Sequence, residues 1–295
     1  MEHYLDIFLR SFTEYAAYLK NEILFSYDYK PWWENYFYWL ILLSIVVWSI
    51  ELITPWRKGQ KAVRKDFRLD VFYMFFNFFL LSLIGYNAIS NIGVELFNQF
   101  LSLFGLTNLV AINVASWPTW AQFGLMFVLA DFIQWNVHRL LHRVPWLWEF
   151  HKVHHSVKEM GFAAHLRFHW METFVYKSIQ YVPLAMIGFG LQDFFIMHMV
   201  TLLIGHLNHA NLNLDYGLLR YVLNNPKMHI WHHVKQMPKQ YPNGFNFGIS
   251  LSIWDYIFGT ALIPSDGRDI ELGFDGDENF PQGFVGQAAF GLGGK

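Results

Sequence analysis

The chain has 295 residues, of which 54% are hydrophobic, 20% aromatic and only 15% charged. Soluble domains usually contain about 25% charged residues, and the apolar residues here form long blocks, so the composition indicates an integral membrane domain. A net charge of −2 gives no reason to expect a nucleic-acid partner. The absence of cysteine excludes disulfides, thiolate metal sites and cysteine nucleophiles.

The N-terminal region, residues 1–34, is predicted to form a short amphipathic helix. Its first twenty residues, MEHYLDIFLRSFTEYAAYLK, include acidic side chains and lack the basic start and cleavage site of a signal peptide. His3 is expected at the surface.

Three later blocks have the length and apolar character of membrane-spanning helices, which need about 20 residues: 37–54, 69–89 and 117–138. Six Lys and Arg side chains lie in the loop 55–68, and none lies between that loop and His138. The positive-inside rule therefore predicts that the loop and the end of the third block are cytoplasmic. The N-terminus should face outward, as should segment 92–115, which is expected to be interfacial or partly embedded.

Residues 174–211 could form one long span or a tight hairpin. We predict a hairpin that turns near residues 188–193, because it returns His206 and His209 to the same membrane face as His138. The polar remainder from Leu212 onward should form a cytoplasmic cap.

Together these segments predict an all-α, multi-pass membrane bundle of about three spans plus a helical hairpin, with a cytoplasmic histidine-rich cap. We expect three regions: the amphipathic helix region 1–34, a membrane-embedded domain over 35–265, and a C-terminal tail over 266–295.

Ten of the fourteen histidines occur in four clusters whose members are one, three or four residues apart: His138 and His142; His151, His154 and His155; His206 and His209; His229, His232 and His233. Residues three or four apart share a helix face, and neutral imidazole is the commonest metal ligand among side chains. Ten imidazoles exceed the four ligands of a structural zinc, so two metals with about five ligands each are predicted. Imidazole suits Fe, Zn, Cu and Ni alike, which leaves the metal open.

The ordered boxes HRLLH, HKVHH and HIWHH, followed by WDYIFGT, resemble the fatty acid hydroxylase/sterol desaturase superfamily of membrane di-iron oxygenases. The resemblance covers about residues 117–260. It implies a cytosol-facing centre of two iron ions that activates O2 and attacks an unactivated C–H bond of a lipid. The eight histidines of the three boxes would be ligands, and His209, together with His206, would complete the set.

Asp131 lies seven residues before His138, and a carboxylate inside a predicted span is by default a functional candidate. The resemblance agrees, because an Asp commonly precedes the first box at this distance. We predict that Asp131 accepts the free N–H of a ligating imidazole; the alternative is a structural pair with Arg139 or Arg143.

The stretch HLRFHWMET, residues 165–173, offers further candidates for substrate binding or for support of the ligands: His165, Arg167, His169 and Glu172. Superfamily members often carry Arg, His, Pro and Glu here, but Trp170 stands where Pro is common. We favour packing or lipid head-group binding over metal ligation for His165 and His169. His198, inside the hairpin, could line the substrate path, although a packed, hydrogen-bonded role is the commoner one.

The chain contains no dinucleotide fingerprint and no evident haem or flavin domain, so electrons are expected from an external reductase, a ferredoxin or cytochrome, or a diffusible reductant. The sequence thus favours a lipid hydroxylase or desaturase, in a bacterial inner membrane rather than the endoplasmic reticulum. A membrane metal transporter or metal-binding protein and a dinuclear zinc hydrolase are the alternatives. Transporters usually hold their ligands near the bilayer midplane, whereas these clusters are predicted at helix ends.

Overall fold

The computed structural model describes residues 2–79, 95, 99–105, 114–173, 179–180, 184, 189 and 191–293. Within these residues the chain forms helices joined by loops, and its β contacts are three isolated bridges. The predicted all-α class is confirmed for this part of the chain.

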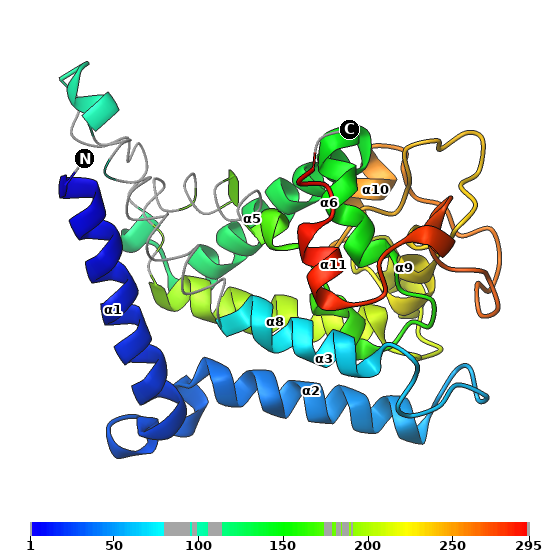
Figure 1. Ribbon diagram of the computed structural model, residues 1–295, viewed down its shortest axis with the longest axis horizontal. Helices are drawn as coiled ribbons and strands as arrows, with labels where there is room; N and C mark the ends of the chain where they lie inside the picture. Colours follow the sequence, from blue (N-terminus) through cyan, green and yellow to red (C-terminus); the bar gives the residue numbers. More distant parts are fainter. Residues whose placement is uncertain are drawn as a thin grey trace.

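The first two helices meet in an L shape at one end of the molecule (Figure 1). Helix α1 (Glu2–Leu24) lies across this end, and α2 (Tyr36–Ile53) runs away from it. Asn35 fixes the corner: its side-chain oxygen caps α2 by accepting from the Tyr38 N–H, and its amide donates to the Glu22 carbonyl.

Three further helices build the body of the molecule: α3 (Phe67–Phe76), α5 (Thr119–Arg143) and α8 (Leu191–His209). Helix α8 packs against α2, α5 and the short 3-10 helix η5 (Phe162–Leu166). Because α8 touches all of these elements, it fixes its C-terminal histidines relative to both α5 and η5.

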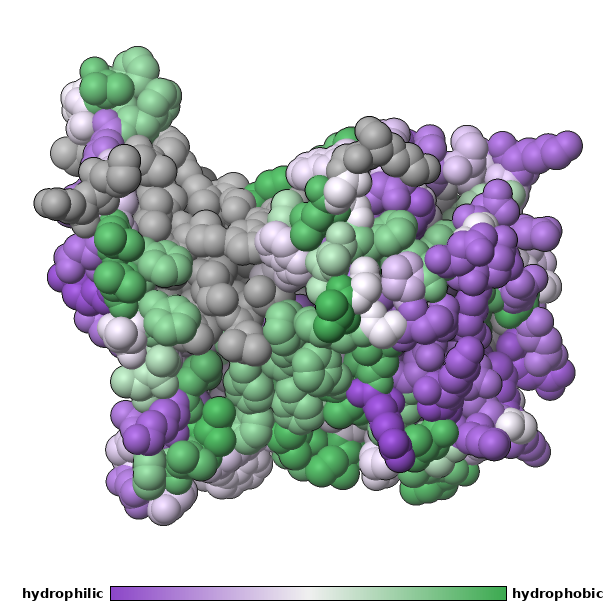
Figure 2. All heavy atoms as spheres, viewed as in Figure 1, coloured by the Kyte–Doolittle hydropathy of each residue, from purple (hydrophilic) through white to green (hydrophobic). Residues whose placement is uncertain are grey.

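The remaining elements form the cap, at the other end from α1 (Figure 1). They are α6 (Pro145–His155), η6 (Gly217–Tyr221), α9 (Pro226–His232), α10 (Ile253–Ile257), η7 (Asp277–Asn279) and α11 (Phe284–Ala289). Three other 3-10 turns are Ser26–Asp28, Trp32–Glu34 and Val114–Ser116. Figure 2 shows hydrophilic residues gathered over the cap side and hydrophobic residues over α2 and α3.

Among the described helices, one, α2, is long and apolar enough to cross a bilayer, and 22% of that stretch is buried. The predicted block 117–138 is helical as part of α5. The block 69–89 begins as α3, and its residues from 80 onward lie outside the described part of the chain. Most of the predicted hairpin turn and first arm also lie outside it, whereas Asp193 belongs to α8.

Within the described residues, the predicted C-terminal tail, 266–295, packs against the rest of the chain. Phe284 of α11 packs its ring against Phe72 and Tyr73 of α3, at 4.8 and 5.1 Å between ring centroids. Phe274 and Phe280 join the same buried cluster. These phenylalanines bury apolar area on folding, which holds the segment against α3.

Candidate metal centre

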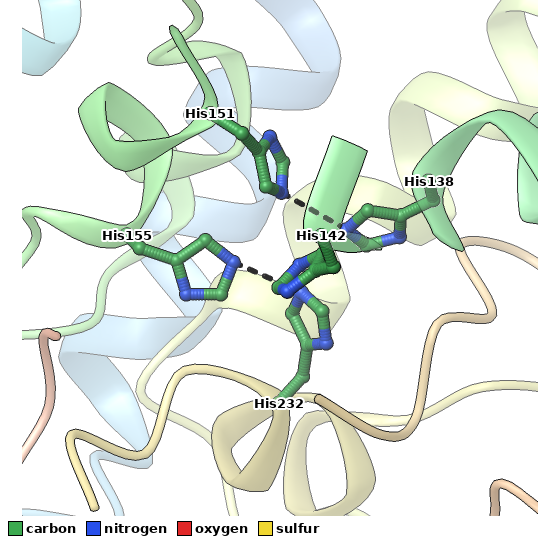
Figure 3. Close-up of side chains that lie close together, drawn as sticks. All are labelled: His138, His142, His151, His155 and His232. Atoms are coloured by element: carbon green, nitrogen blue, oxygen red, sulfur yellow. Dashed lines mark hydrogen bonds between the residues drawn. The ribbon is translucent and has the colours of Figure 1, made fainter. Parts of the chain in front are cut away.

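The histidine boxes meet in two adjacent groups of buried side chains. In each group the ligand atoms lie within 4.8 Å of one another. The five-histidine group, drawn in Figure 3, comprises His138, His142, His151, His155 and His232. The four-histidine group comprises His154, His209, His229 and His233. Nine of the ten predicted ligands are in these groups.

Helical periodicity explains how one box serves both groups. On α6, His151 and His155 are four residues apart and share a face, so both enter the five-histidine group, while His154 enters the other. On and just after α9 the split is reversed: His229 and His233 enter the four-histidine group, and His232 the other. The two groups therefore touch, and the rings of His155 and His233 are stacked with centroids 4.4 Å apart.

The spacing of the imidazole nitrogens fits bound metal ions. Pairs of Nε2 atoms are 3.1 Å apart between His138 and His151 and 3.0 Å apart between His209 and His229. Two nitrogens bound to one metal at about 2.1 Å and at right angles would be roughly 3.0 Å apart. In addition, the buried Nε2 of His142 has no hydrogen-bond partner, as expected of an atom that binds a metal.

The hydrogen bonds of the Nδ1 atoms determine which ring nitrogen points to the centre of each group. The Nδ1 atoms of His138, His232 and His209 each lie 2.8 Å from a backbone carbonyl oxygen, of Phe247, Phe245 and Gly205 respectively. A carbonyl can only accept, so each Nδ1 carries the proton and donates it. Each Nε2 then keeps its lone pair toward the group, which is the arrangement a metal requires.

The protein interior also keeps the imidazoles neutral. Burial lowers the pKa of His155, His229 and His232 well below its ordinary value, and the neighbouring imidazoles act in the same direction. The neutral ring is the form that binds metal.

Asp131 does not contact a histidine through any hydrogen bond of the described residues, so its predicted partner was wrong. Its carboxylate accepts from the backbone N–H groups of Ser250 and Leu251 and from the Trp254 indole. No described ion pair joins it to Arg139 or Arg143 either. Asp131 instead ties α5 to the loop before α10.

Sequence reasoning missed Asp255, which organises the same loop. Its buried carboxylate accepts from the Phe247 and Gly248 N–H groups, at 3.0 and 2.7 Å, and from the Trp135 indole. Asp255 thereby places the Phe247 carbonyl that orients His138. The WDYIFGT motif, which contains Asp255, was the available signal.

Glu172 is the carboxylate that does contact a histidine. Its Oε2 accepts from Nδ1 of His151 at 2.7 Å, and its Oε1 accepts from the His169 N–H. Arg167 contributes through its backbone, because its carbonyl lies 3.3 Å from Nδ1 of His154. The Arg167 side chain is buried and ion-paired with Asp70.

His206 and His165 lie together, outside both groups. Their Nδ1 atoms are 3.3 Å apart, and Nε2 of His206 lies 3.1 Å from the Ser44 hydroxyl on α2. The placement of His206 does not fit its predicted role as a ligand, because its ring nitrogens face these partners. The His165 ring rests on Gly205 of α8, where a Cβ atom would lie 2.1 Å from its Nε2.

The two remaining candidates are also apart from the groups. His169 donates through Nε2 to the Ala288 carbonyl at 2.9 Å, and its Nδ1 accepts from the Met171 N–H. It therefore binds the C-terminal segment to the domain. His198 lines a cavity and packs against Tyr36 with ring centroids 6.0 Å apart.

That cavity, of about 190 Å³, borders both groups. Its walls include two members of the five-histidine group and three of the four-histidine group: His138, His151, His154, His209 and His229. Away from them it is mainly apolar and follows α8 to His198, roughly 16 Å from His209 at 1.5 Å per residue. A narrow apolar molecule could therefore lie along α8 with one part beside the histidines.

Comparison with known proteins identifies the segment that carries both groups. Residues 123–260 match the family model described as fatty acid hydroxylase. The match covers slightly less than half of the chain, and all nine grouped histidines lie within the matched segment, which is thus similar to fatty acid hydroxylases. No solved structure matches the chain significantly.

Several curated proteins resemble a part of this chain. Ornithine lipid hydroxylase OlsE of Rhizobium tropici is 34% identical over 59% of this chain and 51% of that protein. Human alkylglycerol monooxygenase is 28% identical over 59% of this chain and 40% of that protein. Rice very-long-chain aldehyde decarbonylase GL1-10 is 24% identical over 79% of this chain and 77% of that protein. The matches to the first two relatives span about half or less of their length.

Proposed function

We propose that this protein is a membrane-bound, non-haem di-iron oxygenase that hydroxylates, or desaturates, a C–H bond of a lipid with O2 and external electrons. The observation that carries the proposal is the pair of adjacent histidine groups bordering one apolar cavity inside a segment similar to fatty acid hydroxylases. A structural metal site needs no such cavity, whereas a reaction on a lipid chain does.

Two iron ions are the cofactor that we assign, with the five-histidine group holding one and the four-histidine group the other. Bound iron would supply the reductive activation of O2. The chain itself supplies neutral imidazoles with their lone pairs pre-oriented by Phe245, Phe247 and Gly205, and a Glu172 carboxylate that raises the basicity of His151.

The residues that line the cavity would bind the substrate and exclude water. The apolar wall along α8 would hold an alkyl chain, so that the reacting carbon lies beside the histidines rather than in solvent. Two of the relatives are named as a hydroxylase and a monooxygenase of lipids. Their names support a lipid substrate here and favour hydroxylation over desaturation.

The membrane arrangement is also part of the proposal. Helix α2 would cross the bilayer, with the basic loop 55–68 and the cap on the cytoplasmic side. A bacterial inner membrane agrees with the bacterial source of one relative. Electrons would come from a separate reductase, a ferredoxin or cytochrome, or a diffusible reductant.

The decisive experiment compares lipids of cells that express the chain with lipids of cells that express His209→Ala. We expect untargeted lipidomics to find a lipid that has gained one oxygen atom, or lost two hydrogen atoms, only with the wild-type chain. His3→Ala, which changes an exposed histidine, is the matched control.

Anaerobic reconstitution of the purified protein separates the proposal from its alternatives. Fe(II) should support lipid-dependent O2 consumption when a reductant is added. A zinc-loaded protein that hydrolyses a lipid without O2 would replace the oxygenase by a hydrolase. Metal flux across proteoliposomes without lipid conversion would replace it by a transporter.

A further inference from the structure

One side of the cap exposes five large apolar side chains. We call this the η6–α10 patch; its members are Leu218, Leu219, Val222, Ile257 and Phe258. Leu218 is 84% exposed and Ile257 is 62% exposed. Folded proteins rarely expose large contiguous apolar patches unless the patch meets a membrane, a ligand or another protein.

Hydrogen bonds hold the two halves of the patch together. The Ser252 N–H donates to the Val222 carbonyl at 3.0 Å, and the Asn224 N–H donates to the Ser250 carbonyl at 2.9 Å. The rings of Tyr221 and Tyr256 pack with centroids 5.0 Å apart. The apolar side chains are therefore presented by a braced surface rather than by a loose loop.

The patch adjoins α5 through the Phe258 ring. The Phe258 ring packs on Trp135 and Phe132, with ring centroids 4.8 and 6.1 Å apart, and both partners lie in the block 117–138 that is predicted to span the membrane. Leu140 of α5 and Val144, which follows the last residue of α5, are exposed as well. Trp135 is buried and Phe132 is partly exposed, so Phe132 joins the patch to the exposed side of α5. Asp255, the carboxylate of α10, is buried and does not interrupt this contact.

Two arginines lie at the edge of this surface, where lipid head groups would be if the surface entered a membrane. The Arg139 guanidinium lies 4.4 Å from the centre of the Trp135 ring, and that of Arg220 lies 5.0 Å from the Tyr221 ring. Amphipathic cations place their stems on apolar surface and their charge toward water or lipid phosphate. This charge pattern favours an anionic lipid leaflet over a neutral protein surface.

We propose that the η6–α10 patch inserts into the lipid leaflet on the cap side, with Arg139 and Arg220 at the level of the head groups. The inference rests on the proposed membrane location of the protein, but not on its metals or its reaction. It adds a membrane contact to the cytoplasmic cap that the sequence predicts beyond Leu212. Because Ile249, next to the braced segment, lines the cavity, insertion would bring that wall close to the acyl chains.

Single cysteines introduced into this cysteine-free chain test the proposal. Leu218→Cys and Ile257→Cys would be labelled with an environment-sensitive fluorophore in nanodiscs of phosphatidylcholine and phosphatidylglycerol. Ser265→Cys is the matched control, because Ser265 is exposed, is not a member of the patch, and the change is nearly isosteric. We expect blue-shifted emission at 218 and 257 and several-fold stronger quenching by spin-labelled lipid than at 265.

Two outcomes would overturn the inference. Equal quenching and equal reactivity toward a water-soluble maleimide at all three positions would place the patch in water. Shielded labels without lipid quenching, accompanied by cross-linked dimers, would show that a second copy covers it. Leu219→Cys gives an independent position if either variant folds poorly. None of these readouts requires turnover, so a failure of the proposed function would leave the result intact.

Discussion

Both histidine groups contain residues from α6 and from α9 or the residue after it. Their other histidines, and the carbonyls that orient them, come from different elements. The five-histidine group is completed by α5 and is oriented by the carbonyls of Phe245 and Phe247 in the cap. The four-histidine group is completed by His209 of α8, whose ring is oriented by the Gly205 carbonyl of the same helix. One group therefore depends on the cap loop, and the other depends on the position of α8.

This difference indicates which of the two groups is more accessible from the cavity. Three of the four members of the smaller group line the cavity, compared with two of the five in the larger one. With fewer imidazoles, the smaller group would also leave more ligand positions open on a bound metal. Under the proposed function, the four-histidine group would therefore be the side where O2 and substrate meet.

Removing the α8 ligand should have the largest effect. We expect His209→Ala to abolish turnover and to reduce bound iron from about two to about one per chain, since it removes a ligand from only one group. Elemental analysis of anaerobically loaded protein measures this. His169→Ala should keep about two irons, because His169 contacts Ala288 and Met171 instead. Full occupancy in His209→Ala would remove α8 from the site.

Gly205→Ala should disturb the four-histidine group, because the added methyl group would collide with the His165 ring. The added Cβ would lie 2.1–2.6 Å from atoms of the His165 ring, so Gly205→Ala should destabilise the fold by about 1–3 kcal/mol and weaken one iron site. Adding His165→Ala should restore most of the thermal stability. Gly124→Ala on α5 meets nothing within 4 Å and is the matched control. Equal effects of the two glycine substitutions would contradict the packing argument.

Glu172 gives the corresponding test of the five-histidine group. Glu172→Gln replaces the carboxyl group beside His151 by an amide of the same shape, and it should lower activity or metal affinity by about 10- to 100-fold. Iron titration monitored by absorbance would measure the loss. Asp266→Asn, at an exposed position, should behave like wild type. A loss of iron from the four-histidine group alone would reverse the assignment.

The smallest effect is expected from the histidine pair outside both groups. His165→Ala and His206→Ala should each retain about two irons, because the ring nitrogens of the pair contact each other and Ser44. Metal analysis after extensive dialysis is the check. Depleted iron in His206→Ala would show that this side chain moves into the four-histidine group when metal binds.

Local spacing allowed the sequence to indicate which histidines gather. Residues three or four apart on a helix share a face whatever the tertiary fold, so the three boxes were recognisable without a structure. How they divide between two groups was not, because the split depends on the rotation of α6 and α9 relative to α5 and α8. His206 shows the limit: its spacing from His209 suits a ligand, but its face of α8 is turned toward α2.

Long-range partners account for the other differences. Asp131 was recognisable as a buried carboxylate, but its partners are more than a hundred residues away along the chain. The same holds for the C-terminal segment, which contacts α3 through Phe284. A periodic signal could not indicate either contact, since both arise from the packing of elements remote in sequence.

The distance along the chain between paired histidines has a consequence for folding. His155 and His232 are 77 residues apart in sequence, and His154 and His209 are 55 apart, yet their Nε2 atoms lie 3.1 and 3.3 Å from each other. An ion that joins such residues closes long loops and restricts the unfolded chain, as a covalent cross-link does. A single cross-link over a loop of this length removes chain entropy on the order of 4 kcal/mol. Iron bound here would therefore stabilise the folded cap in addition to taking part in the reaction.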